Sequence, residues 1–386
     1  MTTALEMEGG VYPVAEWYEE RQGKALINYG AGVSHPGARF EVMEDDPDPD
    51  AGLGDSDAWS HQTALREQIE AIAGLIDEGL SEGAIGIGFG IQYTPAATRE
   101  EIWRMYQVGA EHGVTGFAHV RFASMAEPGS SVEAVQEMIA IAATGASVHV
   151  CHLPSTSLGH LPLLLDMIDA AREQGLDIST EAYPYTASSS FIGAAILDPG
   201  WQERLGRNYG DIVWAATGEP LTEESFERYR REDPSGKIIA HVMEGDMVEA
   251  ALAHPDVMIA GDGGDLSSGT GHPRGAGTHA RVLGLYSREQ GTLTLMDAVR
   301  KMTLLPAQRL EAAVPQMRNK GRIRVGADAD LTIFDPEQVI DRATFDSPAE
   351  PSTGIPYVLV GGTFVVRNSA LVENAAPGQP VRREVH

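Results

Sequence analysis

Three residues that can bind a metal ion each follow an apolar stretch of the sequence. His119 stands in GFAHVR, His152 in SVHVCHLPS and Asp262 in MIAGDGG. Imidazole nitrogens and carboxylate oxygens are ligands of zinc and similar divalent metals. A single histidine after a strand is more often a hydrogen-bonded core residue. Three such positions in one chain favour a metal site instead.

A further histidine, His149, lies three residues before His152. Residues three apart on a strand point to opposite faces, so only one of the two can face the interior of a barrel. His152 is at the end of the predicted strand, where site residues belong. We therefore predict that His152 binds the metal and that His149 packs toward the helices.

Two carboxylates near the start of the chain, Glu6 and Glu8, are two residues apart and share one face of a predicted strand. A buried carboxylate needs a cation or a proton to offset its desolvation, so one of them could bridge metal ions. The alternative is that one or both lie on a solvated edge. Glu8 is nearer the C-terminal end of the strand.

The glycine-rich stretch after Asp262, GGDLSSGTGHPRG, contains His272 and Arg274 on a predicted loop at the same rim, where we predict that both bind substrate. Arg274 could bind a substrate carboxylate through two hydrogen bonds, and a surface arginine is the alternative. Tyr183 and Tyr185 follow another predicted strand in EAYPYTASSS. A phenol there could donate a hydrogen bond to a developing oxyanion, and simple packing is the alternative.

The elements that must position these residues alternate as far as about residue 310. Short β-rich runs are followed by amphipathic stretches, and this pattern predicts βα units on a parallel sheet. Their number favours a closed (β/α)8 TIM-like barrel, which carries functional groups at the C-terminal ends of its strands. The predicted strands are Thr2–Glu8, Ala25–Gly30, Ala84–Gly90, Thr115–Val120, Ser147–His152, Asp177–Ala182, Lys237–Val242 and Val257–Asp262.

Helices between these strands are indicated by periodicity and by capping signals. Leu65, Ile69, Ile72 and Ile76 have helical spacing. The pairs Thr98 with Glu101 and Ser130 with Glu133 predict capping boxes that open two helices.

The chain divides into a barrel over residues 1–315 and a small β portion over residues 316–386. An insertion interrupts the barrel at about 199–236, and short β runs at Gly321–Phe334 and Tyr357–Val366 form the second part. The acidic segment Glu44–Asp57, rich in proline and glycine, is predicted to be an exposed loop.

Composition limits the classes of partner and the compartment. Acidic residues outnumber basic ones by 56 to 28, and the net charge of −28 disfavours nucleic acid and anionic membrane surfaces. Cys151 is the single cysteine, so a disulfide within the chain and a cysteine-rich zinc site are excluded. We expect a cytoplasmic protein that acts on a small-molecule substrate. Both a monomer and a homo-oligomer are compatible with the sequence. The GIGFG segment lacks the dinucleotide fingerprint spacing, and no phosphate loop or G-x-S-x-G motif occurs.

Taken together, HVR at His119, VCH at His152, EAYPYTA, GDGG at Asp262, HPRGAGTHARVLG from His272 and GRIRVGADADLTIFDP resemble the N-acyl-D-amino-acid deacylase branch of the amidohydrolase superfamily. The resemblance covers nearly the whole chain. It implies a zinc-binding barrel of the amidohydrolase type with a small β-sandwich built from both chain ends.

The resemblance also implies roles for individual residues. His119 and His152 match zinc-binding histidines, Asp262 matches a catalytic aspartate, and Arg274 matches the arginine that receives the α-carboxylate of the substrate. Tyr183 or Tyr185 falls where such enzymes place a tyrosine near the scissile carbonyl. The bridging cysteine of D-aminoacylases has no counterpart here. Glu8 is the nearest polar residue to its place, with Glu6 as the alternative.

The sequence departs from this pattern at its start. It contains no His-x-His, and it opens with MTTALEME, which resembles the second barrel strand of such enzymes. We therefore expect Met1 to be an internal methionine of a longer parent, with the first barrel strand missing. Such a barrel would have two open edges, and His119, His152 and a glutamate could still hold one zinc ion.

The predicted activity is metal-dependent hydrolysis of the amide bond of an N-acyl amino acid, with a D-amino acid favoured. A metal would activate water, Asp262 would transfer the proton, and Arg274 would hold the substrate. One alternative is a cyclic amidase of the dihydroorotase kind on the same scaffold. The other is a catalytically impaired or non-enzymatic relative.

Overall fold

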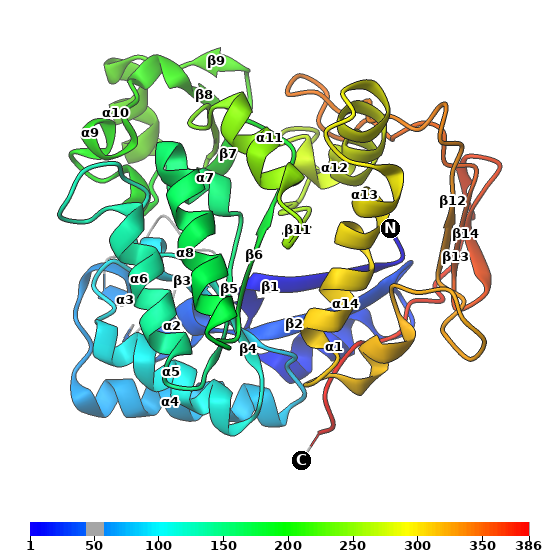
Figure 1. Cartoon of the computed structure of the whole chain (residues 1–386). Helices are drawn as coiled ribbons and strands as arrows, with labels where there is room; N and C mark the ends of the chain where they lie inside the picture. Colours follow the sequence, from blue (N-terminus) through cyan, green and yellow to red (C-terminus); the bar gives the residue numbers. More distant parts are fainter. Residues whose placement is uncertain (44–57, 386) are drawn as a thin grey trace.

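Among the described residues, the central sheet consists of seven strands, all parallel to their neighbours. The computed structural model describes residues 1–43 and 58–385, so the predicted loop Glu44–Asp57 lies outside the described residues. The order in the sheet is β1-β2-β3-β4-β5-β6-β11, with β1 and β11 at its edges (Figure 1). The bounds of these strands are β1 Thr3–Val11, β2 Asn28–Ser34, β3 Ile87–Gly90, β4 Thr115–His119, β5 Ser147–Val150, β6 Ile178–Ala182 and β11 Val257–Ile259.

Helices cover the outer face of this sheet, as expected for a barrel of βα units (Figure 1). In α4 the predicted apolar residues Ile69, Ile72 and Ile76 are buried, whereas Leu65 precedes the helix and is exposed. The helices of the barrel are α1 Val14–Arg21, α2 His35–Met43, α3 Ala58–His61, α4 Arg66–Ser81, α5 Arg99–Glu111, α6 Ser131–Ala142, α7 Leu153–Ser157, α8 Leu161–Glu173, α11 Gly245–Ala253, α12 Arg274–Arg281, α13 Leu295–Met302 and α14 Leu304–Leu310.

Both predicted N-caps are present, although only one forms a complete capping box. Ser130 and Glu133 bond reciprocally at the start of α6. At the start of α5, the Thr98 side chain accepts a hydrogen bond from the Glu101 backbone N–H at 3.1 Å. The Glu101 carboxylate turns instead toward Arg39 and His35, so this half of the predicted box is replaced by a buried ion pair.

The prediction that Lys237–Val242 forms a barrel strand is wrong, because this segment belongs to a different sheet. β10 (Lys237–Ala240) pairs antiparallel with β7 (Ser188–Phe191) and β8 (Ile212–Trp214), in the order β7-β10-β8-β9. The inserted layer is therefore wider than residues 199–236. It also contains β9 Glu219–Pro220, α9 Trp201–Leu205, α10 Glu223–Glu232 and the short 3-10 helix η3 Ala195–Leu197.

The C-terminal β portion is a four-stranded antiparallel sheet beside the barrel (Figure 1). Its strands are β12 Leu331–Ile333, β13 Tyr357–Val360, β14 Thr363–Arg367 and β15 Ala370–Leu371. The chain then returns to the barrel, where the backbone N–H of Val381 bonds to the carbonyl of Tyr29 at 2.7 Å. A separate β module after the barrel was expected from the change in sequence pattern.

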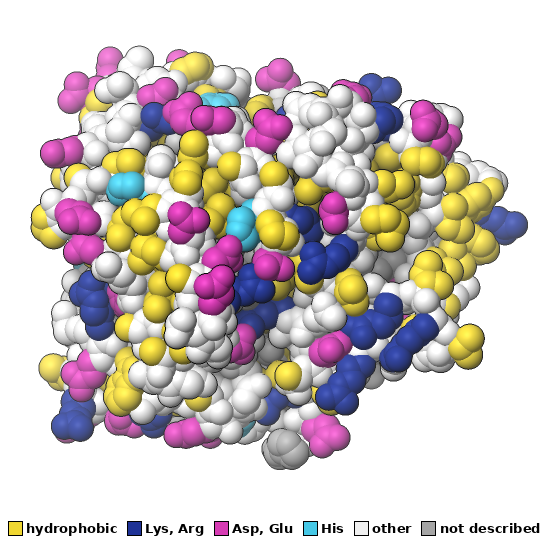
Figure 2. All heavy atoms as spheres, in the orientation of Figure 1, with side chains coloured by type: hydrophobic (Ala, Val, Ile, Leu, Met, Phe, Trp, Pro, Cys, Tyr) yellow, Lys and Arg dark blue, Asp and Glu magenta, His cyan; other side chains and the backbone are white. Residues whose placement is uncertain are grey.

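Charged side chains are distributed unevenly over the face of the molecule that Figure 2 shows. Figure 2 shows acidic side chains spread over the barrel helices on one face, while lysine and arginine side chains gather near α14. Among the described helices, none has the length and apolar character needed to span a membrane.

Candidate active site

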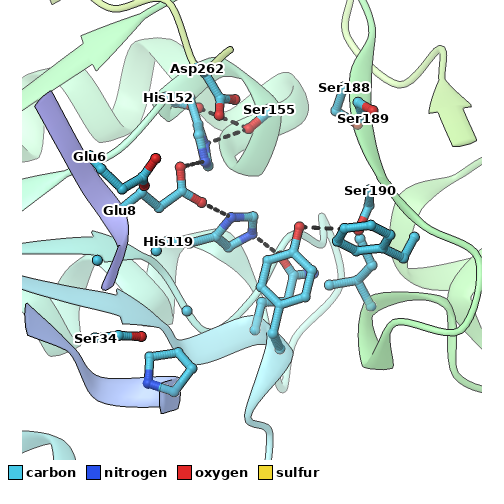
Figure 3. A pocket seen from close by; sticks show the side chains of 18 of the residues that line it. Glu6, Glu8, Ser34, His119, His152, Ser155, Ser188, Ser189, Ser190 and Asp262 are labelled. Atoms are coloured by element: carbon cyan, nitrogen blue, oxygen red, sulfur yellow. Dashed lines mark hydrogen bonds and ion pairs between the residues drawn. The ribbon is translucent and has the colours of Figure 1, made fainter. Parts of the chain in front are cut away.

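Glu8, His119 and His152 meet at the C-terminal ends of strands that are far apart in sequence. One Glu8 oxygen lies 2.9 Å from His119 Nδ1, and the other lies 2.9 Å from His152 Nε2. One potential ligand atom from each residue falls within 4.8 Å of the other two. Figure 3 shows the Glu8 carboxylate between the two imidazole rings. The residues are provided by β1, by the last position of β4 and by the turn after β5.

His152 reaches this point because the chain leaves the strand conformation before it. β5 ends at Val150, and His152 has a left-handed backbone with φ of 30°. The Ser155 hydroxyl donates to the His152 carbonyl at 3.0 Å, so its oxygen is left to accept a hydrogen bond from His152 Nδ1 at 2.7 Å. With Nδ1 donating to Ser155, Nε2 is the nitrogen that faces Glu8, and a metal ion could take the place of its proton there.

The prediction that His149 packs toward the helices is also wrong. His149 pairs in register with Phe117, their rings are 5.1 Å apart, and Nδ1 contacts the Ser179 hydroxyl at 2.7 Å. Phe117 belongs to the face of β4 that also carries His119, so His149 faces the barrel interior. The alternation argument failed because His152 lies beyond the end of the regular strand.

Glu8, and not Glu6, contacts both histidines. Burial raises the pKa of Glu8, but His152 and His119 beside it hold that pKa well below its usual range. Burial lowers the pKa of His152, and the Glu8 carboxylate more than reverses this and raises it to about 9. Glu6 points into the cavity, where burial and the charges of Glu8 and Asp262 raise its pKa to about 7.

Asp262, Arg274 and Tyr183 form the next part of the wall. Asp262 Oδ2 is 2.6 Å from Arg274 Nη1, and the Arg274 guanidinium lies over the Tyr183 ring at 4.7 Å. Burial raises the pKa of Asp262 to about 6 even though Arg274 lowers it. Within the described parts of the chain, the buried Nε of Arg274 and the Tyr183 hydroxyl make no hydrogen bond of good geometry.

His272 and Tyr185, which we predicted as substrate-binding residues, do not line the cavity. His272 Nε2 donates to the Ala187 carbonyl at 2.9 Å, and its Nδ1 accepts from the Arg274 backbone N–H at 3.0 Å. Burial and the nearby Arg274 lower the pKa of His272 to about 2, so the ring is neutral and positions Arg274. Tyr185 packs beneath the guanidinium of Arg281 at 4.8 Å.

The cavity in front of these residues has a volume of about 960 Å³. Its wall includes Gln92 and Tyr93, which sequence reasoning did not single out. Gln92 Oε1 lies 2.7 Å from His119 Nε2, and the Tyr93 ring lies 5.0 Å from that imidazole. The available signal was their position directly after strand β3, at the same rim as the other site residues.

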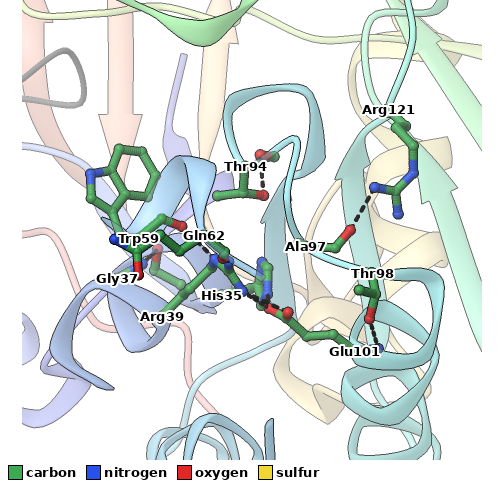
Figure 4. A network of polar contacts seen from close by, with 12 residues as sticks. His35, Gly37, Arg39, Trp59, Gln62, Thr94, Ala97, Thr98, Glu101 and Arg121 are labelled. Carbon is green, nitrogen blue, oxygen red and sulfur yellow. Dashed lines mark hydrogen bonds and ion pairs between the residues drawn. The ribbon is translucent and has the colours of Figure 1, made fainter. Parts of the chain in front are cut away.

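A buried ion-pair network holds one side of the cavity in place (Figure 4). Arg39 bonds to Glu101 at 2.6 Å, and His35 Nε2 lies 2.9 Å from the same carboxylate, with all three side chains fully buried. Arg39 also donates to the backbone carbonyls of Trp59 and Gln62. The network fixes α2, whose residues Pro36, Gly37 and Phe40 line the cavity together with Trp59.

The three residues fit a catalytic zinc ion by their donor chemistry. Two imidazole nitrogens and one carboxylate oxygen make the three-protein-ligand set that leaves a further coordination position open. A parallel barrel with such a cluster at the C-terminal ends of its strands defines a metal-dependent barrel enzyme.

Comparison with known proteins identifies the family. The profile of the amidohydrolase family matches residues 49–366, and the chain belongs to this family. An N-acyl-D-glutamate deacylase from Alcaligenes xylosoxydans xylosoxydans is 32% identical over 381 residues, which cover 94% of this chain and 71% of that protein. A D-aminoacylase from the same organism is 32% identical over 388 residues, covering 94% and 73%.

A solved structure supports the same conclusion. The N-acyl-D-glutamate deacylase from Bordetella bronchiseptica, in complex with zinc and a phosphonate inhibitor, superimposes with a TM-score of 0.80 at 27% identity. The match covers 99% of this chain and 82% of that one. Dihydroorotases match less of the chain, with 26% identity over 255 residues for the Ruminiclostridium cellulolyticum protein. The likeness to deacylases is thus both longer and closer.

Proposed function

We propose that this protein hydrolyses the amide bond of an N-acyl-D-amino acid and releases a carboxylate and the free amino acid. The observation that carries the proposal is the Glu8, His119 and His152 cluster, which lies in one cavity with Arg274 and Asp262. The names of the similar deacylases support the substrate class and the D configuration.

Glu8, His119 and His152 are the residues that would hold zinc. A zinc ion bound by this set supplies Lewis-acid activation of an amide carbonyl and of water. Ser155 keeps His152 in the tautomer that a ligand needs, because it accepts a hydrogen bond from Nδ1.

Asp262 is the proposed proton carrier. It accepts a proton from the water that adds to the carbonyl carbon, and it gives this proton to the nitrogen as the C–N bond breaks. Its pKa of about 6 suits this exchange, because the carboxylate is ionised at neutral pH and yet is a stronger base than an ordinary aspartate.

Arg274 and Tyr183 are the proposed substrate-binding groups. Asp262 occupies the Nη1 side of the guanidinium, so Nε remains as a buried donor for the substrate α-carboxylate. The buried hydroxyl of Tyr183 also makes no hydrogen bond of good geometry within the described chain and can donate to the carbonyl oxygen as negative charge develops.

The test is a substrate panel with the purified protein, with and without zinc. We expect zinc-dependent release of amine from N-acetyl-D-amino acids, with little release from the L isomers. Opening of dihydroorotate or hydantoin rings without deacylation would instead favour the cyclic amidase alternative. Less than stoichiometric zinc together with no amine release from any member of the panel would refute the catalytic assignment.

A further inference from the structure

The contacts around the two histidines distinguish two ends of the cavity. Asp262 and Arg274, the groups proposed to meet the leaving amine and the α-carboxylate, lie beside Tyr183, whose ring is 6.1 Å from that of His152. On the other side of Glu8, His119 is followed by Tyr93, whose hydroxyl accepts a hydrogen bond from Ser190 at 3.2 Å.

An amide carbonyl placed at the cluster therefore separates two halves of the substrate. The amino-acid half lies toward Asp262 and Arg274, because these groups act on its nitrogen and its carboxylate. The acyl half must extend in the opposite direction, over His119 and past Tyr93. That path leads to Ser190 and to the inserted sheet that carries it (Figure 3).

The wall at this end of the cavity is apolar and is built by the inserted layer. The short helix η1 (Ile91–Tyr93) packs against η3, and β10 pairs with β7 behind them. We call the following cavity-lining side chains the inserted wall: Phe191, Ile196, Leu197, Leu205, Ile238 and Val242.

Two serine hydroxyls near the inserted wall form hydrogen bonds within the protein. The Ser189 hydroxyl donates to the Ile238 carbonyl at 3.0 Å, and the Ser190 hydroxyl donates to Tyr93. Among the described residues that line the cavity, Arg274 is the one lysine or arginine. A charged group at the acyl end would thus find no cation there, whereas methylene groups would find apolar surface.

We propose that the acyl group of the substrate is an extended apolar chain that binds along the inserted wall. This inference rests on the proposed function and specifies its substrate class. The volume of about 960 Å³ is near the upper end of the roughly 300–1,000 Å³ range of small-molecule pockets, so an acetyl group would leave much of it unfilled. Each methylene buried there is expected to raise kcat/KM about fourfold.

The test compares acyl groups on one amino acid, chosen as the D-amino acid whose N-acetyl form is hydrolysed fastest. The acetyl, butanoyl and octanoyl derivatives are measured together with a derivative that ends in a second carboxylate, the octanedioyl compound. Octanoyl has six more methylenes than acetyl, and burial of only two of them gives about 16-fold at this rate. We therefore expect kcat/KM to rise at least about 16-fold from acetyl to octanoyl, and the terminal carboxylate to abolish the gain.

Two variants locate the effect on the inserted wall. Ile196→Trp fills the groove from a half-buried position, so the octanoyl-to-acetyl ratio of kcat/KM should fall toward one. Leu205→Phe provides a second, milder obstruction. Ala195→Leu is the matched control, because it adds bulk to the same short helix at a residue that does not line the cavity. Its ratio should equal that of the unmodified protein.

The outcomes separate the inference from the proposed function. Hydrolysis of acetyl substrates with a flat or falling response to chain length would overturn the acyl-chain inference alone. A gain that survives Ile196→Trp and Leu205→Phe would also overturn it, because the chain would then bind elsewhere. Failure to hydrolyse every acyl derivative would overturn the proposed function and this inference with it.

Discussion

Glu8 provides the most direct test of the metal site, since Glu6 is available as a matched control. The variant Glu8→Gln keeps the size of the side chain but removes the charge from between two imidazole nitrogens, each 2.9 Å away. Glu6→Gln makes the same chemical change two residues earlier, on a side chain that contacts neither histidine. The two variants therefore separate a ligand from a nearby acid.

The expected loss can be scaled from known metal sites. Removal of a group that merely supports a ligand costs about 10- to 100-fold in metal affinity, so loss of an anionic ligand should cost at least about 100-fold. That is about 2.7 kcal/mol of zinc-binding free energy. Zinc at about 1,000 times its Kd stabilises a folded protein by about 4.1 kcal/mol. At the same zinc concentration, Glu8→Gln should retain only about 1.4 kcal/mol.

Two measurements check these values. A competition titration against a chelator gives the zinc affinity, and urea unfolding with and without zinc gives the stabilisation. Glu6→Gln should lower the affinity by less than about tenfold, because it removes only a nearby charge. Equal losses in the two variants, or a larger loss in Glu6→Gln, would refute the assignment of Glu8 as the ligand.

Three other expectations follow from the site and from the network beside it. Burial raises the pKa of Asp262 to about 6 in the substrate-free protein, and the base must be ionised, so kcat/KM should fall as pH drops through about 6; a kcat/KM that is constant down to pH 5 would contradict this. Arg274→Gln should lower kcat/KM for N-acyl amino acids by about 100-fold, mainly through a higher KM, and an unchanged KM in steady-state assays would count against the carboxylate-binding role. Glu101→Leu leaves the fully buried Arg39 without a counter-charge, so urea unfolding should show a loss of about 3–5 kcal/mol, and a loss below about 1 kcal/mol would show that the pair is not needed.

The convergence of distant residues could be predicted because parallel strands carry their C-terminal ends to one rim. Each of Glu8, His119 and Asp262 is at the end of a predicted strand or one residue before it, and the structure places all of them in one cavity. Only a periodic pattern and a residue type were needed for this step. The choice between Glu6 and Glu8 required coordinates, because both share one face of β1.

Long-range pairing explains where the sequence reasoning failed. The segment from Lys237 has the apolar sequence that is typical of a barrel strand. Its partner β7 has the sequence SSSF, which does not by itself predict a strand. The antiparallel pairing that removes β10 from the barrel is therefore invisible in the local pattern. His149 was misplaced for a related reason, since the position at which β5 ends is set by the turn into α7.

The glycines of β3 show how the central sheet brings Glu8 to histidines on strands that are not its neighbours. β2 and β3 lie between β1 and β4, and the pairing of β1 with β2 shifts register between Glu6 and Val11. A Cβ atom on Gly88 would lie 2.6 Å from the backbone oxygens of Met7 and Glu8. The backbone of β1 thus passes directly against that of β3, which only glycine permits. Any side chain at position 88 would displace the segment that carries Glu8 from His119 and His152, so Gly88, the central glycine of GIGFG, has a structural role in the geometry of this site.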